Sequence, residues 1–566
     1  MPYRAPVEEY SFLFENIVGL EQVTATDRFG DASNDVVTAI LTEAGKMCEE
    51  VVSPLQRNGD LHPAVLENGV VRTSHGFAEG YAAVAGGGWI GMSADPENGG
   101  MGLPMALTTA VNEMMSSACL SLQLNPLMTQ GQIEALEHHA SDLIKDIYLP
   151  KLISGEWCGT MNLTEPQAGS DVGALRTKAE PNGDGTYAIT GQKIYISWAD
   201  NDFTENVCHL VLARLPDAVP GTKGISLFMV PKLIPDEAGT PGARNSLRVV
   251  SLEHKMGLHG SPTAVMEYDG AKGWLVGPEH GGMAAMFTMM NNARLGVGVQ
   301  GVGVAEAAYQ HARAYASDRK QGKAEGTGAI IEHADVRRML ADMKADTFAA
   351  RAIAFMTASA IDMSTATGDA AWEARAALLT PINKAFGTDT GVDVAATGIQ
   401  VHGGMGFIEE TGAAQFARDV RVTTIYEGTN GIQAMDLVSR KLLDSGDAAF
   451  RLIEEIETDA EAAKVTHPEL AEAVWSAAES LRETTEVLLT QNVADRMAGS
   501  VPYLHAFARV LGAQAHLAAV LHGDDARHSL GAYYIQNRLP QLTGLLAQAR
   551  SGADHLKGIS ADVLAA

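Results

Sequence analysis

The strongest constraint on the fold is a change in hydrophobic periodicity along the chain. Residues 1–156 carry apolar positions at the three-to-four spacing of helices, whereas residues 157–280 form short strand-like runs separated by Gly, Pro and Asn. Helical periodicity returns at residue 281 and continues to the C-terminus. This order predicts a mainly α protein with a compact β barrel or sandwich in its middle.

The same pattern predicts several domains, because 566 residues exceed one ordinary domain. We expect an N-terminal helical domain, a β-barrel domain, a helical bundle and an additional C-terminal helical domain, at residues 1–156, 157–280, 281–440 and 441–566. The last domain is alanine-rich and acidic, with no pattern of metal ligands, nucleophile or phosphate loop. We expect it to serve in helical packing or as a dimer surface.

Individual elements follow from local periodicity. The clearest strand-like runs are at 187–197, 209–214, 225–230 and 263–268. The clearest helical segments are at 36–52, 107–119, 133–149, 305–316, 336–357 and 380–397. No apolar run is expected to reach membrane-spanning length.

Charge and cysteine usage exclude several functions. The net charge of −28 and the pI of about 5.0 oppose nucleic acid and anionic membranes as partners. The 4 cysteines lie far apart without CxxC spacing, so we expect neither a metal site nor disulfides. The N-terminus lacks the basic flank and apolar core of a signal peptide. We therefore expect a cytoplasmic protein that binds no metal, nucleic acid or membrane.

One late stretch, residues 425–431, combines a carboxylate with a glycine turn and a following helix. Glu427 stands beside Tyr426 and before Gly428. The backbone N–H groups from Gly428 to Gly431 point out of the helix start, where they can bind an anion. A base next to an anion cradle suits proton abstraction beside a phosphate-bearing cofactor. By itself the stretch favours an ordinary helix start, with Thr429 as the cap and Glu427 as a solvated neighbour.

Two further glycine-containing motifs need weighing. In residues 160–171, small and hydroxyl residues surround Pro166 and Gly169, which allows backbone donors to approach a flat polar ligand or forms a plain structural turn. Residues 296–301 match GxGxxG, but no strand precedes them as a dinucleotide site requires. For this second motif we expect close helix packing.

Residues 163–166 with 168–171 resemble the flavin-binding signature of the acyl-CoA dehydrogenase family. Five further matches follow in the order of that family, at 191–197, 255–258 with 261–263, Arg294, 400–407 and 425–429. The resemblance covers roughly residues 30–440. It implies an acyl-CoA dehydrogenase-like fold, with FAD between barrel and bundle and with the tail as an extra domain.

The resemblance also implies a chemistry, the FAD-dependent α,β-dehydrogenation of an acyl-CoA thioester. Glu427 would remove the α-proton, with its pKa raised by apolar surroundings, while the β-hydrogen leaves as hydride to the flavin. The thioester carbonyl would be held by the Glu427 N–H and a flavin ribityl hydroxyl. Some branches place the base one residue before the arginine matched to Arg294; here that residue is Ala293, which cannot take a proton.

Other site residues are implied by position in the family motifs. The implied cofactor-binding residues are Met161, Leu163, Thr164, Ser170, Tyr195, Ser197, Arg319, Gln400, Gly404 and Thr429. Of these, Arg319, Gln400 and Gly404 would hold the adenosine half of the FAD in a partner subunit. The implied substrate-binding residues are Ser170, Asn291, Arg294, Glu427 and Gly428. The sequence departs from the family where Gln321-Gly322 replaces an aromatic residue and where Tyr195 replaces Trp.

The resemblance further implies a homo-oligomer, dimer or tetramer, and an electron-transfer flavoprotein as electron acceptor. Residues 2–8 and 318–322 look most like the branch that includes 3-methylmercaptopropionyl-CoA dehydrogenases, which act in dimethylsulfoniopropionate breakdown. Two alternatives stay open, a generic medium- or long-chain fatty acyl-CoA dehydrogenase and a flavin-bearing DNA-associated protein. The acidic chain opposes the second alternative.

Overall fold

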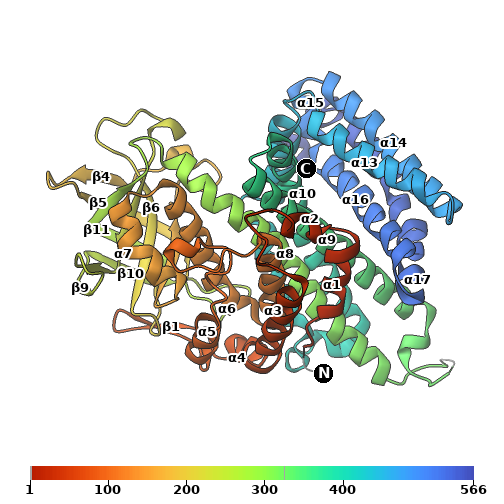
Figure 1. Cartoon of the computed structure of the whole chain (residues 1–566), viewed down its shortest axis with the longest axis horizontal. Coiled ribbons are helices and arrows are strands. Elements are labelled where there is room, and N and C mark those ends of the chain that lie inside the picture. Colours follow the sequence, from red (N-terminus) through yellow and green to blue (C-terminus); the bar gives the residue numbers. More distant parts are fainter. Residues whose placement is uncertain (1–2, 324–325) are drawn as a thin grey trace.

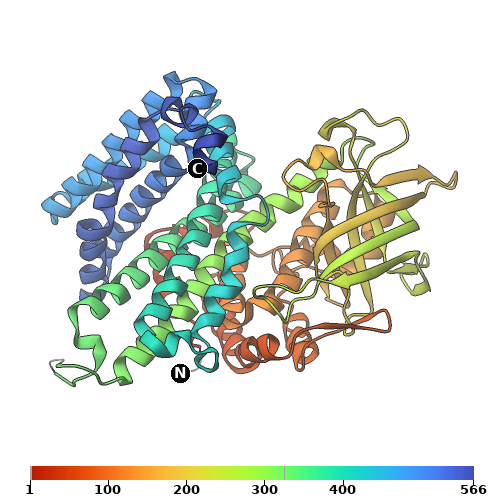
Figure 2. The same cartoon turned by 180° about the vertical axis from the view of Figure 1, so that it is seen from behind.

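The computed structural model describes residues 3–323 and 326–566 of the chain. A β-rich domain lies at one end, the C-terminal helices lie at the other, and the long helices of the bundle lie between them (Figures 1 and 2). The order of helical, β and helical regions predicted from periodicity is confirmed.

The N-terminal region is helical around one long buried helix, α6. Its elements are α1 Val7–Asn16, α2 Leu20–Thr24, α3 Asn34–Met47, α4 Ser53–Leu61, β1 Val65–Glu67, β2 Val70–Arg72, α5 Phe77–Gly86, α6 Met105–His139 and α7 Asp142–Ile153. The helices expected at 107–119 and 133–149 are wrong in their limits. Helix α6 runs through residues 120–132 with a kink at Cys119, and the break falls at Ala140 and Ser141.

The middle region is a curled sheet of seven strands. They are β3 Trp157–Asn162, β4 Lys178–Pro181, β5 Tyr187–Ser197, β6 Asn206–Ala213, β7 Ser226–Pro231, β10 Leu247–Leu252 and β11 Thr263–Val276. The order is β3-β6-β7-β11-β5-β4, with β10 also on β11; among these strands of the described residues, β3 and β6 form the one parallel pair. A separate hairpin is formed by β8 Leu233–Pro235 and β9 Pro241–Arg244.

The sheet closes into a barrel just beyond β6. Arg214 N donates to Thr177 O at 2.9 Å, and Ala179 N donates to Arg214 O at 2.8 Å. These bonds join the segment at β4 to the end of β6 and so bring the two sides of the sheet together. The barrel interior is filled by side chains such as Ile189, Phe228 and Tyr268.

Glycines bring the central bundle helices into close contact. The bundle contains α8 Gly282–Asp318, α9 Ala334–Thr367, α10 Ala370–His402, α11 Ala413–Val420 and α12 Asn430–Asp436. A Cβ atom on Gly301 would lie 2.2 Å from the Gly387 carbonyl oxygen, and one on Gly298 would lie 2.4 Å from Asn383. The GxGxxG pattern therefore serves close packing of α8 against α10, as expected.

A buried ion network ties the N-terminal region to the bundle. Arg351 on α9 is fully buried and donates to Glu113 on α6 at 2.6 Å and to Glu306 on α8 at 2.8 Å. It also contacts Glu9 on α1. Burial lowers the pKa of Arg351 to about 9, so its guanidinium stays charged at neutral pH.

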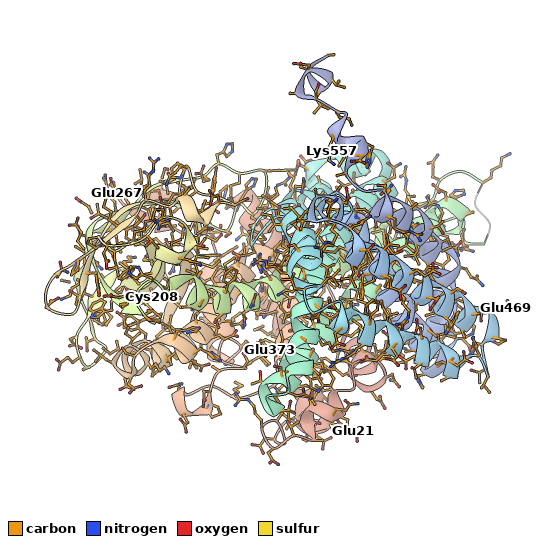
Figure 3. All side chains as sticks on the ribbon, turned by 90° about the horizontal axis from the view of Figure 1, so that it is seen from above. Glu21, Cys208, Glu267, Glu373, Glu469 and Lys557 are labelled. Carbon is orange, nitrogen blue, oxygen red and sulfur yellow. The ribbon has the colours of Figure 1, made fainter. Side chains whose placement is uncertain are left out.

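The tail forms the additional helical domain that periodicity predicts. Its helices are α13 Asp447–Ala463, α14 Pro468–Thr490, α15 Val493–Ala498, α16 Ser500–His522, α17 Asp525–Tyr533, α18 Leu542–Arg550, α19 Asp554–Lys557 and α20 Ala561–Ala565. Helix α16 packs against α9 and α10. Asp346 on α9 is held there by Arg509 and Arg538. Figure 3 shows the last helices projecting from the rest near Lys557.

Helix α16 corrects one expectation. It is the one helix of the described residues that is long and apolar enough to cross a membrane by length and composition, so an apolar run of that length does exist. However, 72% of its apolar window is buried within the protein. Its apolar residues therefore form the core of the C-terminal domain.

Substituting Gly301 with alanine tests the glycine contact between α8 and α10. We expect Gly301→Ala to destabilise the protein by about 1–3 kcal/mol, because the new methyl meets backbone that cannot move aside cheaply. Thermal denaturation at fixed FAD concentration measures this change.

Gly544→Ala on α18 is the matched control, because a Cβ atom at Gly544 meets nothing within 4 Å. This variant should keep the wild-type melting temperature or raise it slightly, since alanine favours helices. Equal melting temperatures for the two variants would contradict the packing role of Gly301.

Candidate active site

The catalytic candidate Glu427 lies in a strained turn between two helical segments. Its backbone is left-handed, with φ of +54°, and the next residue, Gly428, has φ of +84°. A non-glycine residue in this region is uncommon and persists only where surrounding contacts impose it. The helix α12 begins two residues later, at Asn430.

Three side chains from three helices hold the two carbonyls of this turn. The Glu427 carbonyl accepts from Arg294 Nε at 3.4 Å and from Gln433 Nε2 at 3.1 Å. The Gly428 carbonyl accepts from Lys384 Nζ at 2.9 Å. Arg294, Lys384 and Gln433 are all buried. They come from α8, α10 and α12, so the turn is fixed by assembly of the whole bundle.

The surroundings of Glu427 set the acidity of its side chain. Burial raises the pKa of its carboxyl to about 7, although Arg294 and Lys384 act in the opposite direction. The residue keeps some exposed surface, yet the protein around the carboxylate excludes enough water for burial to dominate. The raised pKa expected from the sequence is confirmed, and it suits proton transfer near neutral pH.

The turn also presents free backbone donors. Within the described part of the chain, no acceptor is bonded to the backbone N–H groups of residues 427–431. Thr429 Oγ1 caps the helix by accepting from Ile432 N at 3.3 Å. Buried Gln433 Oε1 likewise has no partner among the described residues. This set of unsatisfied polar groups fits a ligand that carries an anion and hydroxyls, as FAD does.

A buried ion pair organises the expected flavin loop on the barrel. Lys193 Nζ donates to Glu165 at 2.9 Å and to the Leu163 carbonyl at 2.9 Å. Burial raises the pKa of Glu165, but Lys193 and the donors of Arg176 and Thr177 outweigh burial and hold the pKa at about 2. Burial lowers the pKa of Lys193 to about 8, so both groups are charged at neutral pH.

This ion pair gathers one group of predicted cofactor residues. Ile194 N donates to the Thr164 carbonyl at 2.9 Å, which places the loop after β3 against strand β5. Met161, Leu163, Thr164 and Ser197 are half-buried there, while Ser170 is exposed. Tyr195 has φ of +61° and is 62% exposed, so its ring is free to meet a ligand.

The remaining predicted residues fall into two places. Asn291 is exposed one helical turn before Arg294 on α8, near the Glu427 turn.

Arg319 lies about 37 Å beyond Arg294 at the far end of α8, given the rise of ~1.5 Å per residue. Gln400 and Gly404 are exposed at the corresponding end of α10, where His402 stacks on Tyr315 of α8. The structure therefore does not bring Arg319, Gln400 and Gly404 together with Glu427.

Sequence reasoning missed Lys384, Gln433 and the pair of Glu165 and Lys193 as site residues. Lys384 lies in a continuously buried run of α10 that holds no other charged residue, and a buried lysine signals a structural partner. Glu165 and Lys193 both stand inside the quoted motifs, but the spacing of 28 residues gives no sign that they pair.

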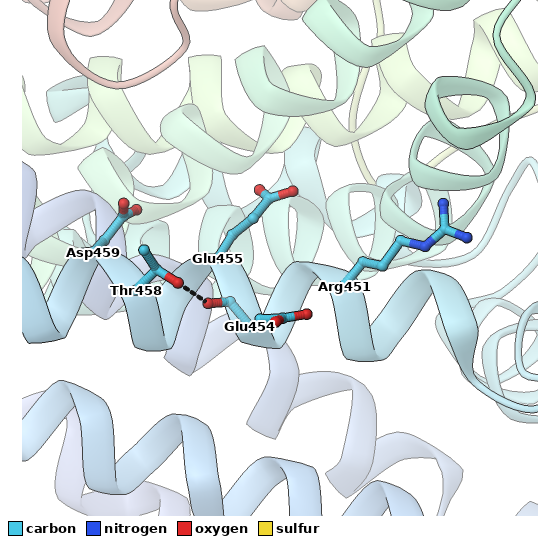
Figure 4. Close-up of a pocket in the computed structure, with 5 residues that line it drawn as sticks. All are labelled: Arg451, Glu454, Glu455, Thr458 and Asp459. Atoms are coloured by element: carbon cyan, nitrogen blue, oxygen red, sulfur yellow. Dashed lines mark hydrogen bonds between the residues drawn. The ribbon is translucent and has the colours of Figure 1, made fainter.

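A surface hollow elsewhere lacks this chemistry. It measures about 460 Å³ on α13 and is lined by Arg451, Glu454, Glu455, Thr458 and Asp459 (Figure 4). Thr458 donates to the Glu454 carbonyl at 2.8 Å, an ordinary bond within the helix. No group of three or more metal-ligating side chains occurs among residues 3–323 and 326–566.

Comparison with known proteins identifies the family of this chain. Models for the N-terminal, middle and C-terminal domains of acyl-CoA dehydrogenases match residues 38–156, 160–271 and 280–443. A model described as acetyl-CoA dehydrogenase C-terminal like matches residues 452–559. The chain is 47% identical over 522 residues to a 3-methylmercaptopropionyl-CoA dehydrogenase of Ruegeria pomeroyi, covering 89% of this chain and 88% of that protein.

Two solved structures share the fold over nearly the whole chain. One is Caenorhabditis elegans ACDH-11 in complex with C11-CoA, with a TM-score of 0.80, 21% identity and coverage of 94% of this chain and 91% of the other. The second is a Bacillus anthracis acyl-CoA dehydrogenase complexed with FAD, with a TM-score of 0.75, 20% identity and coverage of 98% and 94%. The domain matches and the 47% identity show that this chain belongs to the acyl-CoA dehydrogenase family of FAD-dependent oxidoreductases.

Proposed function

We propose that this protein dehydrogenates 3-methylmercaptopropionyl-CoA to methylthioacryloyl-CoA. The reaction class rests on family membership and on one structural observation: Glu427, with a pKa of about 7, lies at a turn whose backbone donors are free. The choice of acyl group is supported by the name of the relative that is 47% identical over 89% of this chain.

Glu427 removes the α-proton of the thioester. The α-hydrogen is a poor acid, so the developing enolate oxygen must be stabilised at the same time. The Glu427 N–H provides a donor for that oxygen, because no acceptor among the described residues occupies it. When bound, FAD supplies the acceptor for the β-hydrogen, which leaves as hydride. Arg294, Lys384 and Gln433 keep the base and its N–H in position.

The barrel residues near Glu165 and Lys193 provide one side of the FAD site. Met161, Leu163, Thr164, Ser170, Tyr195 and Ser197 would hold the flavin there, and Thr429 would contact the diphosphate. Asn291, Arg294 and Gly428 would complete the substrate site with Ser170 and Glu427.

We further propose a homo-oligomer, a dimer or tetramer, in which Arg319, Gln400 and Gly404 bind the adenosine half of the partner's FAD. Arg319 lies far from Glu427 along α8, and Gln400 and Gly404 lie at the corresponding end of α10, which supports their binding the FAD of a partner rather than the FAD beside Glu427. The neighbouring loop exposes Met405, Phe407 and Ile408, with Phe407 87% exposed, as a subunit interface requires. An electron-transfer flavoprotein as acceptor and a cytoplasmic location complete the proposal.

The base assignment predicts a specific defect. Glu427→Gln should keep FAD bound but slow flavin reduction by acyl-CoA at least ~10²-fold, because the amide cannot take the α-proton. Anaerobic stopped-flow bleaching of the flavin measures this rate, with FAD absorbance as the control for cofactor content. Bleaching of the mutant flavin at the wild-type rate would contradict the role of Glu427.

The pKa of Glu427 predicts the pH dependence of the reaction. Only the carboxylate accepts a proton, so kcat/KM should rise with pH through about 7 and fall away below it. Lys384→Met should move this rise to higher pH, because the Lys384 ammonium lowers the pKa of Glu427. A kcat/KM profile that is flat across neutral pH, or unmoved in the variant, would contradict this account.

The substrate proposal is tested by a panel of thioesters. Anaerobic flavin bleaching with 3-methylmercaptopropionyl-CoA, butyryl-CoA and palmitoyl-CoA should give the highest rate constant at low concentration for the sulfur-containing substrate. A preference for palmitoyl-CoA would instead indicate a long-chain fatty acyl-CoA dehydrogenase.

A further inference from the structure

Helix α16 of the additional C-terminal domain reaches the bundle beside the catalytic turn. His505 on α16 lies with Nε2 at 3.1 Å from Asp389 Oδ2 on α10. The other oxygen of that carboxylate, Asp389 Oδ1, accepts from Asn430 Nδ2 at 2.8 Å. Asn430 is the first residue of α12, three residues after Glu427. One carboxylate thus joins the C-terminal domain to the catalytic turn.

The same network continues to the backbone next to the base. Asn430 Oδ1 accepts from Lys384 Nζ at 2.9 Å, and Lys384 Nζ also donates to the Gly428 carbonyl at 2.9 Å. We call His505, Asp389, Asn430 and Lys384 the inter-domain network. Every step from the C-terminal domain to the Gly428 carbonyl is then a direct polar contact.

The donors and acceptors of the inter-domain network leave one arrangement only. A carboxylate can only accept, so the Asn430 amide must turn its Nδ2 to Asp389, which leaves its Oδ1 to accept from Lys384 Nζ. His505 satisfies one Asp389 oxygen and thereby leaves the other for Asn430. Rotation of the carboxylate would therefore disturb the amide and, through it, the lysine that holds the turn.

We propose that the C-terminal domain takes part in catalysis as a support for the base, with His505, Asp389 and Asn430 as positioning residues that act through Lys384. This inference rests on the proposed function of Glu427. Neighbouring contacts of the same domain interface lead away from the turn: Tyr533 donates to Asp342 at 2.9 Å, and Arg538 pairs with Asp346. Docking of the domain therefore has supports that are independent of His505.

Variants of His505 test the proposal in the full-length holoenzyme. His505→Leu removes the donor to Asp389, whereas His505→Gln keeps an N–H that can reach it. We expect His505→Leu to slow flavin reduction about three- to tenfold at saturating butyryl-CoA or 3-methylmercaptopropionyl-CoA, as one lost hydrogen bond would. FAD content should be unchanged, and His505→Gln should restore most of the rate.

Tyr533→Phe is the matched control, because it removes one hydrogen bond from the same interface outside the inter-domain network. This variant should reduce its flavin at the wild-type rate. The proposal is overturned if His505→Leu reacts as fast as wild type, if His505→Gln reacts as slowly as His505→Leu, or if Tyr533→Phe is equally slow.

A double-mutant cycle keeps the test decisive if His505→Leu folds poorly. Asp389→Asn and His505→Ala should each slow flavin reduction, and combining them should add little further effect, because both act through the same carboxylate. Fully additive effects would overturn the proposal. If none of these thioesters bleaches the flavin of the wild-type protein, the proposed function itself is contradicted. If the flavin of every variant is bleached at the normal rate, only the support role of the C-terminal domain is contradicted.

Discussion

The structure depends on how the backbone at Glu427 and Gly428 is held. A non-glycine residue in the left-handed region costs about 1–3 kcal/mol, so the turn needs compensation from outside its own sequence. Hydrogen bonds from charged donors contribute about 1.5–3 kcal/mol each, and Arg294 and Lys384 both supply one. The strain is therefore offset only when α8 and α10 have packed against the turn.

The glycine contacts of α8 and α10 make that arrangement possible. Gly298 lies against Asn383 and Gly387, and Asn383 Nδ2 donates to the Leu295 carbonyl at 3.2 Å. Arg294 and Lys384 flank this contact in sequence, so close approach of the two backbones brings both cations to one level of the bundle. The same low-water environment raises the pKa of Glu427, which links helix packing directly to proton abstraction.

Much of the fold could be predicted because its signals are local. Strand β5 has the limits given by alternating residues, and the strands at 206–213, 226–231 and 263–276 overlap those expected. The long buried helix α6 was divided wrongly, because a helix that is buried on all sides loses the polar face that periodicity detects. At residues 425–431, Thr429 caps helix α12 while the backbone N–H groups of the turn stay free. The ordinary helix start and the anion site, which the sequence offers as alternatives, are therefore compatible. Partners such as Lys384 and Gly428, or His505 and Asp389, lie too far apart in sequence for spacing to reveal them.

The central claim is that this turn aims Glu427 and its N–H at one thioester. The most direct measurement is a crystal structure of the holoenzyme with FAD and an acyl-CoA analogue that cannot be dehydrogenated. Our account predicts the Glu427 carboxylate about 3–3.5 Å from the α-carbon, with the thioester oxygen at hydrogen-bonding distance from the Glu427 N–H. An α-carbon out of reach of Glu427, or a thioester oxygen bound elsewhere, would contradict it.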